Sequence, residues 1–249
     1  MENNTLNIPT EKIDLPSKGL VYPKESPLSS GVIEMKYMTA REEDILTNKN
    51  FLKKGIMFDE LLKALIVSDI DQSELIEGDR AAILVAARIL AYGKDYVYVQ
   101  NGEEKTVDLT TLEEKEIDHE YLEGKNNNFE FTLPKSKANI TFKLLTHGDE
   151  KKIDQEVEGM KKINKNFSAE SSTRLKHMIT SVNGSADPND IRSFIDKEML
   201  AMDARAFRKH YNDISPDINM TTTIENEDGE EEVVNVPMGI QFFWPDFGI

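Results

Sequence analysis

The chain has 249 residues, 39% of them hydrophobic, and its 30 basic and 46 acidic side chains give a net charge of −16. This length suits one large domain or two small ones, and the hydrophobic content excludes wholesale disorder. The negative charge excludes non-specific binding to nucleic acid backbones, and the absence of cysteine excludes disulfides, thiolate metal sites and cysteine nucleophiles.

The beginning of the chain lacks the basic and apolar regions of a signal peptide. No apolar run in the sequence reaches the roughly 20 residues that a membrane-spanning helix needs. The sequence therefore predicts a protein without a membrane span that is soluble and retained in a cytoplasm.

Residues 1–31 are rich in proline, which forbids a helix and favours extended chain. They also carry apolar side chains, including Leu15, Leu20 and Tyr22, that a free linker would not need. The sequence predicts an extended N-terminal arm. Two interpretations are equally open: the arm lies across its own domain, or these three residues dock on a partner protein.

The segment Asp79–Gly93 is apolar or small almost throughout and rich in strong helix formers. Asp79 is suited to cap the helix at its start, and Gly93 to the left-handed position after its end. A helix that is apolar all round must be covered by protein, so this is expected to be the buried centre of the fold. Arg88 then needs a carboxylate partner or a route to solvent, and a structural role is preferred to a catalytic one.

Apolar spacing and turn signals predict the remaining elements. Further helices are expected after a Thr39–Glu42 capping box, at 58–67, 149–164 and 168–182, and from Pro188 to just before Ser215. Hairpins are expected for 96–100 with 105–109 around Asn101-Gly102, and for 220–224 with 233–236 around Asp228-Gly229. A further strand pair is expected from 129–133 and 139–145.

This order of elements predicts an α+β fold. The predicted fold has a mainly helical core around the buried central helix, two antiparallel β-hairpins and the extended N-terminal arm. The predicted regions are the arm at 1–31, a first helical and hairpin half at 32–145, and a second helical half with the C-terminal hairpin and aromatic tail at 146–249.

The sequence supports no catalytic, cofactor-binding or metal-binding residue. It has no nucleotide-binding glycine loop, no GxSxG context, and four histidines that are far apart, which are His119, His147, His177 and His210. Two alternatives to a protein-binding role stay open. One is a metal-dependent hydrolase using His147 with Asp149 and Glu150, and the other is an acidic mimic of nucleic acid.

The chain ends in an aromatic cluster that includes Phe242, Phe243 and Trp244. Aromatic side chains anchor cores and interfaces alike. A tail that closes the core is preferred, because an exposed cluster this apolar would promote aggregation. The alternative is that the cluster anchors a partner.

Several stretches together resemble the baseplate proteins of T-even-like, contractile-tailed phages, a family that includes baseplate hub subunits and hub assembly chaperones. The stretches, in chain order, are IDLPSKGLVYP at 13–23, MTAREEDIL at 38–46, GDRAAILVAARILAYG at 78–93, FKLLTHGDE at 142–150, RLKHMITSVNG at 174–184, FIDKEMLAMDARAFRKHY at 194–211 and VPMGIQFFWPDF at 236–247.

The resemblance implies non-enzymatic work in tail assembly, with other hub proteins and tape-measure proteins as partners. It also implies a place in the host cytoplasm during assembly or in the tail baseplate of the virion. The oligomeric state is left open. In the family the two hairpins can resemble zinc knuckles with paired cysteines, but the turns at 100–104 and 226–230 contain none, so no zinc role is expected here.

Overall fold

The computed structural model describes residues 8–100, 102–163, 169–225 and 231–243, which form α-helices and small antiparallel sheets, an α+β fold. The helices are α1 (Ala40–Leu46), α2 (Lys49–Lys54), α3 (Met57–Leu65), α4 (Glu77–Tyr92), α5 (His119–Leu122), α6 (His147–Ile163), α7 (Glu170–Met178), α8 (Pro188–Lys197), α9 (Ala201–Ile214) and α10 (Ile240–Phe243). The strands are β1 (Thr10–Asp14), β2 (Val32–Lys36), β3 (Asp95–Gln100), β4 (Glu103–Asp108), β5 (Phe129–Thr132), β6 (Asn139–Phe142), β7 (Ile179–Val182), β8 (Thr221–Glu225) and β9 (Glu231–Asn235).

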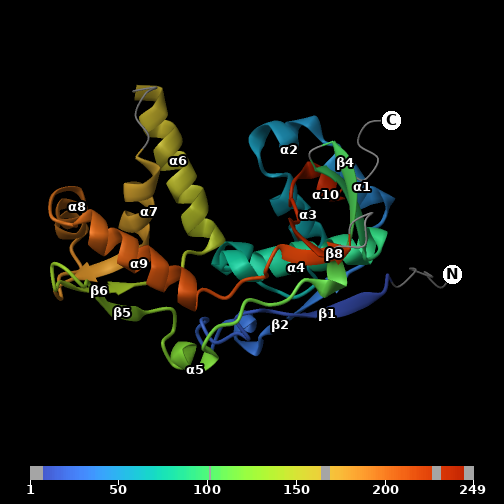
Figure 1. Cartoon of the computed structure of the whole chain (residues 1–249). Coiled ribbons are helices and arrows are strands. Elements are labelled where there is room, and N and C mark those ends of the chain that lie inside the picture. The colour runs from blue at the N-terminus through green and yellow to red at the C-terminus, as the bar shows by residue number, and fades with distance from the viewer. Residues whose placement is uncertain (1–7, 101, 164–168, 226–230, 244–249) are drawn as a thin grey trace.

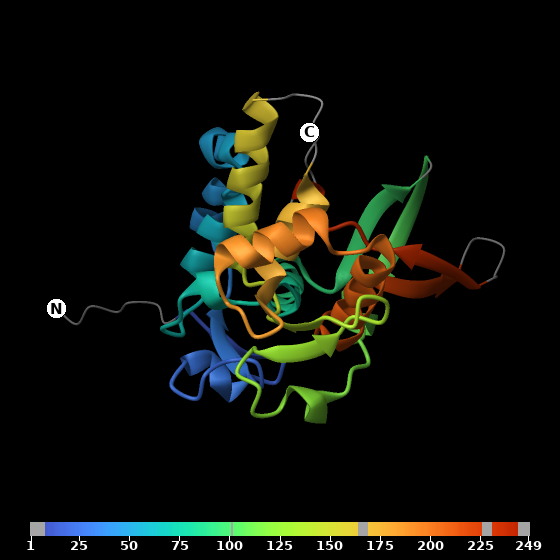
Figure 2. The ribbon, with the colours of Figure 1, turned by 90° about the vertical axis from the view of Figure 1, so that its left-hand side faces the viewer.

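The predicted central helix is α4, which lies in the middle of the molecule, above β1 and β2 in the view of Figure 1. Helices α6 and α7 rise on one side of the molecule, and α2 and α3 lie above α4 on the other side. The three-stranded sheet β5-β6-β7 lies with α8 and α9, and the hairpins β3-β4 and β8-β9 project from the opposite part of the molecule (Figure 2). Buried apolar residues from all these parts form one continuous core.

Helix α4 differs from the prediction at its start. The N-cap residue is Ile76, without a side-chain capping bond, so the prediction that Asp79 caps the helix is wrong. Asp79 lies inside the first turn, fully buried. Its carboxylate accepts hydrogen bonds from the Ser17 backbone N–H at 2.9 Å, the Ser17 hydroxyl at 2.6 Å and the Tyr22 hydroxyl at 2.6 Å. A buried carboxylate needs such donors, and here another segment supplies them.

Arg88 is 2% exposed, so it lacks the predicted route to solvent, and no carboxylate of the described residues pairs with it. Its guanidinium donates to the carbonyl oxygens of Gly93 at 2.9 Å and Asp95 at 3.2 Å. The rings of Tyr92 and Tyr96 lie against it, with centroids 5.2 and 5.7 Å from Cζ. Arg88 thus fastens the end of α4 to the start of β3, a structural role.

The described part of the N-terminal arm, residues 8–31, folds onto its own domain. Strand β1 pairs antiparallel with β2, in a register that sets Ile13 opposite Ile33. The chain then turns twice, and Gly19 and Gly31 adopt positive φ where the two turns meet. A Cβ on Gly19 would lie 2.4 Å from the Ser29 carbonyl oxygen, so the close approach of these turns requires glycine.

Most of the predicted strands form. Both predicted hairpins are present, as β3-β4 and β8-β9, and the predicted pair around Pro134 is β5-β6. The predicted helix at 168–182 is wrong in its last part, because α7 ends at Met178 and β7 follows it directly. Strand β7 takes the free edge of β6, where pairing with a neighbour outweighs the local helical spacing.

The single helix expected from Pro188 to Ser215 is divided into α8 and α9. The buried residues of α8 are Ile191, Phe194 and Ile195, and those of α9 are Asp203, Ala204 and Phe207. At about 3.6 residues per turn, the two sets would face nearly opposite directions on one straight helix. The break at residues 198–200 turns the second set back toward the core.

Strand pairing and side-chain packing cross the predicted boundary at residue 145. Strand β7 completes the sheet of β5 and β6, and α10 packs on the first half of the chain. The Phe242 ring meets Tyr96 edge-on with centroids 5.0 Å apart, and Phe243 lies 5.5 Å from Phe58. Residues from both predicted halves therefore share one core.

Candidate functional site

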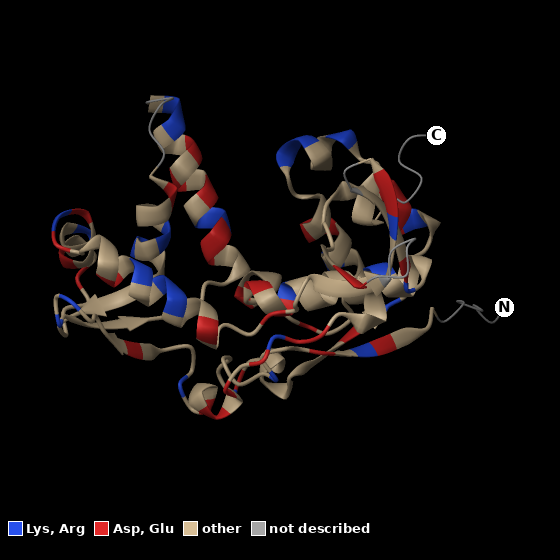
Figure 3. Ribbon diagram, viewed as in Figure 1, with Lys and Arg blue, Asp and Glu red and all other residues tan. Residues whose placement is uncertain are grey.

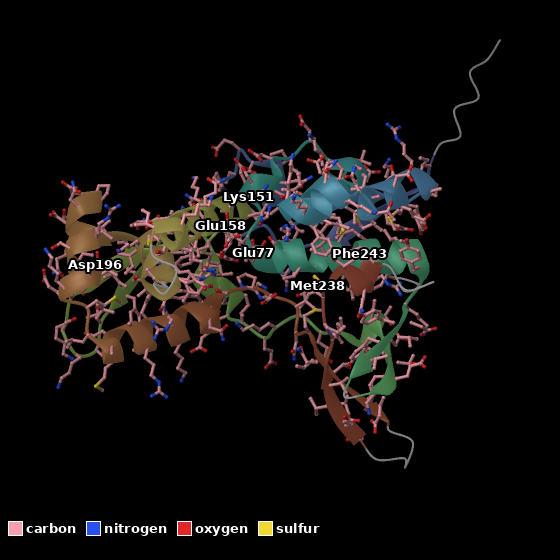
Figure 4. The ribbon with its side chains drawn as sticks, turned by 90° about the horizontal axis from the view of Figure 1, so that it is seen from above. Glu77, Lys151, Glu158, Asp196, Met238 and Phe243 are labelled. Carbon is pink, nitrogen blue, oxygen red and sulfur yellow. The ribbon has the colours of Figure 1, made fainter. Side chains whose placement is uncertain are left out.

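A cleft of about 870 Å³ lies between α6 on one side and α2 and α3 on the other. The first turn of α4 forms its floor, and Figure 4 shows Glu77, Lys151 and Glu158 around it from above. Charged side chains gather at the floor: Asp59 of α3, Glu77 and Arg80 of α4, and His147 and Lys151 of α6.

Asp59 is the centre of this charged group. Its Oδ1 accepts from His147 Nε2 at 2.7 Å and from Arg80 Nη2 at 3.0 Å, and its Oδ2 is 2.8 Å from Lys151 Nζ. Partial burial acts to raise the pKa of Asp59, but the hydrogen bonds from His147 and Lys151 outweigh it and hold that pKa well below its usual range. One carboxylate thus links α3, α4 and α6.

His147 has carboxylates at both ring nitrogens, because Nδ1 lies 3.4 Å from Glu77 Oε1 while Nε2 bonds Asp59. These hydrogen bonds, to Asp59 first and then to Glu77, raise the pKa of His147 above its ordinary value, against the effect of burial. The doubly protonated ring is therefore favoured. That form has no lone pair with which to take up a proton or bind a metal ion.

We expect the stability of the protein to depend on the protonation of His147. A histidine whose pKa is raised in the folded state stabilises fully below its unfolded pKa of about 6.5, and loses this contribution as the pH rises through the folded value. His147→Gln should therefore lower the melting temperature at about pH 6, since a charge-assisted hydrogen bond contributes roughly 1.5–3 kcal/mol. The melting temperature of this variant should also fall less between about pH 6 and about pH 8.5 than that of the wild type, because the variant has no His147 proton to lose.

Thermal unfolding across that pH range measures this effect. Asp59→Asn provides the matched comparison, because it removes the carboxylate charge and keeps the side-chain volume, so it should flatten the same part of the profile. Identical pH profiles for the wild type and His147→Gln would contradict the role given to the ion pair.

The three residues of the predicted hydrolase site do not converge. His147 faces Asp59 and Glu77, as described above. Asp149 turns back to the start of its own helix, where it bonds Thr146 and lies 2.7 Å from Lys143 Nζ. Glu150 forms a two-pronged ion pair with Arg174, at 2.5 and 2.6 Å. Within residues 8–100, 102–163, 169–225 and 231–243, no three or more His, Asp or Glu side chains are grouped so that they could hold a metal ion.

Most of the predicted partner-binding residues lie in the core of the chain itself. Leu15 is 1% and Tyr22 6% exposed, and Leu20 is partly buried against the same core. Phe242 and Phe243 are completely buried. Trp244 lies outside the described residues. These positions favour the interpretation that the arm and the start of the aromatic tail pack on their own domain.

Sequence reasoning missed Asp59, Arg80 and Lys151 as members of one site. Asp59 and His147 are 88 positions apart, and neither belongs to a recognisable motif. The sequence analysis chose His147 because Asp149 and Glu150 follow it, whereas the side chains that contact His147 come from other helices. No local signal could have identified this group, since only the packing of α6 beside α3 and α4 brings it together.

The described residues form no helix that is both long and apolar enough to cross a membrane, as the sequence predicts. Comparison of the chain with protein-family models, with curated proteins and with solved structures finds no match.

Proposed function

We propose that the protein acts by binding other proteins during assembly of a contractile-tail baseplate, as a hub component or as a hub assembly chaperone. The support is the ordered resemblance to baseplate proteins, together with where the resembling stretches lie in the fold. Its partners would be other hub proteins and tape-measure proteins. Its place would be the host cytoplasm during assembly, or the tail baseplate of the virion if it stays in the particle.

The observation that carries this proposal is that the resembling stretches, far apart in sequence, contact one another through specific polar bonds. Segment 13–23 meets 78–93 through the bonds of Ser17 and Tyr22 to Asp79. Segment 142–150 meets 194–211 where the Leu145 N–H donates to the Tyr211 hydroxyl at 2.8 Å.

Segment 142–150 also meets 174–184, through the Glu150–Arg174 ion pair and the bond from the Lys143 N–H to the Met178 carbonyl oxygen at 2.9 Å. Any protein of this fold needs suitable side chains at these contact positions. Two proteins that share the fold are therefore expected to resemble each other in the stretches that make such contacts.

No observation favours either alternative. The His147 ring is held between two carboxylates, which suits an ion pair between helices and does not suit an acid–base or metal-binding role. Mimicry of nucleic acid would need acidic side chains alone along one face, whereas Lys and Arg alternate with Asp and Glu over most elements in Figure 3.

Co-expression with the hub and tape-measure proteins of a contractile-tailed phage tests the proposal. We expect a tagged copy of the chain to retain at least one of these proteins through a salt wash, while the same resin without the chain retains none. Failure to retain any of them would refute it. Mass spectrometry of mature virions then separates a resident hub component, which is present, from a chaperone, which is absent.

A further inference from the structure

Helix α9 presents an unpaired basic face on a protein whose net charge is −16. Arg205, Arg208 and Lys209 are exposed, and Figure 3 shows basic segments along this helix. No ion pair joins any of the three to a described residue, unlike Arg80, Lys105, Lys143 or Arg174. Their spacing of three and four residues places them side by side on the helix surface, about 5–6 Å apart.

The two acidic residues of α9, Asp203 and Asp213, form no ion pair with this face. Asp203 is completely buried, and its carboxylate accepts hydrogen bonds from the backbone N–H groups of Lys135 at 2.7 Å and Ser136 at 2.9 Å. Asp213 follows Lys209 by four residues, but no ion pair joins the two side chains among the described residues. Most of the positive charge of α9 is therefore available to an external partner.

A small pocket of about 340 Å³ adjoins the basic face between α7, α8 and α9, and its lining includes polar Ser171 and Ser172 as well as apolar residues. Arg208 lies at its edge, so the charged face and the pocket are continuous. Beside it the side chains of Leu200 and Met202 are 45% and 69% exposed. Its apolar lining consists mainly of Leu175, Ile195, Met199, Ala201 and Ala204.

We propose that this face binds an acidic segment of a partner protein, whose carboxylates meet Arg205, Arg208 and Lys209 while one apolar side chain enters the pocket. The inference rests on the proposed function, in which the partner is a tail-assembly protein. Charge complementarity favours an acidic partner, because the carboxylates of such a partner are attracted to the three basic side chains.

The pocket selects a protein over a nucleic acid or an anionic membrane. Its volume suits one or two side chains, and its apolar residues Leu175, Ile195 and Met199 give an apolar side chain a contact that phosphate groups do not use. The net charge of −16 also repels extended anionic surfaces such as DNA or a membrane. A short acidic peptide contacts one helix only, so it experiences less of this repulsion.

Fluorescence polarisation with a labelled, glutamate-rich peptide that carries one central leucine tests the face directly. Arg205→Glu/Lys209→Glu should weaken binding about ten-fold or more. The control, Lys152→Glu/Lys162→Glu, makes the same charge change at exposed positions of α6 and should weaken it about two-fold at most. No binding to the wild type, or equal loss in both double variants, would overturn the proposal.

The pocket has its own test in the same assay. A peptide with alanine in place of the leucine should bind the wild type about ten-fold more weakly, because the buried apolar area is lost. Equal affinities would remove the pocket from the site. The choice of a protein partner would be overturned if duplex DNA or phosphatidylserine vesicles bound more tightly than the peptide and if Arg205→Glu/Lys209→Glu abolished that binding.

The pull-down with hub proteins distinguishes failure of this inference from failure of the proposed function. If the wild type and Arg205→Glu/Lys209→Glu retain a hub protein equally, the α9 face is refuted and the assembly role stands. If the peptide binds and no hub protein is retained, the assembly role is refuted and the acidic-segment site stands. Loss of the hub protein in the α9 variant alone supports both.

Discussion

Replacing Gly78 by alanine should destabilise the protein by about 3 kcal/mol or more, since forcing extra atoms into a packed site costs roughly 1–3 kcal/mol and sometimes more. Gly78 lies in the first turn of α4. A Cβ there would be 1.9 Å from the Pro216 carbonyl oxygen and 2.7 Å from the Pro216 carbonyl carbon. Both are backbone atoms, so no side-chain rotation relieves the clash.

The segment that approaches Gly78 is also fixed from its other side. The Lys115 N–H donates to the Asp217 carbonyl oxygen and the Asn219 N–H to the Glu113 carbonyl oxygen, each at 2.8 Å. Moving Pro216 away from α4 would break this short ladder. The strain therefore stays at the crossing of α4 and the segment after α9, where the two parts of the chain pack.

Gly159 supplies the matched control for this substitution. It lies in α6 with nothing within 4 Å of a built Cβ, so Gly159→Ala should stabilise by about 0.5–1 kcal/mol through helix propensity. Thermal unfolding should show Gly78→Ala melting roughly 6–12 °C below the wild type and Gly159→Ala slightly above it. Equal melting temperatures for Gly78→Ala and the wild type would show that the crossing is not close-packed.

Asp79→Ala should cost about 3 kcal/mol or more, because it leaves three buried donors without their acceptor and each such loss costs roughly 1–3 kcal/mol. These donors are the Ser17 N–H, the Ser17 hydroxyl and the Tyr22 hydroxyl. Burial raises the pKa of the Tyr22 hydroxyl, and the Asp79 charge adds to the shift, so Tyr22 remains a neutral donor to that carboxylate. The arm should then detach from α4.

Graded variants separate this network from simple loss of volume. Tyr22→Phe removes one hydrogen bond to Asp79 and the acceptor of the Ile76 N–H, so it should cost about 1–3 kcal/mol. Asp154→Ala, an exposed carboxylate on α6, should change stability by less than about 0.5 kcal/mol. Denaturant unfolding that ranks Asp79→Ala no lower than Asp154→Ala would refute the anchoring role of Asp79.

Such an anchor explains why the arm's apolar residues are buried. Its proline-rich chain cannot form a helix, and only one short strand of it pairs with a neighbour. The hydrogen bonds of Ser17 and Tyr22 to Asp79 compensate for this small amount of secondary structure, because they hold the two turns of the arm against the first turn of α4. We therefore expect the arm to contribute to folding of the first half of the chain, whatever partner the protein binds.

Local patterns in the sequence determined the elements whose stabilising contacts are local. Thr39 and Glu42 form the predicted capping box, and Asp187 and Pro188 begin α8 as predicted. Strands β3 and β4, and strands β8 and β9, pair as the two predicted hairpins. Hydrogen bonds within a turn or a cap join residues two to four apart, so the amino acids themselves specify them.

The tertiary structure alone decided the roles of polar groups whose partners are distant in sequence. Asp79 is of a residue type that often caps helices, but here its carboxylate is buried and accepts hydrogen bonds from residues 57 and 62 positions away. Residues 179–182 carry a helical pattern and form β7, because β6 offers an unpaired edge. His147 meets Asp59 only because α6 and α3 face each other across the cleft. Each of these outcomes depends on long-range contacts, whose energy exceeds local preference and leaves no pattern in the adjacent sequence.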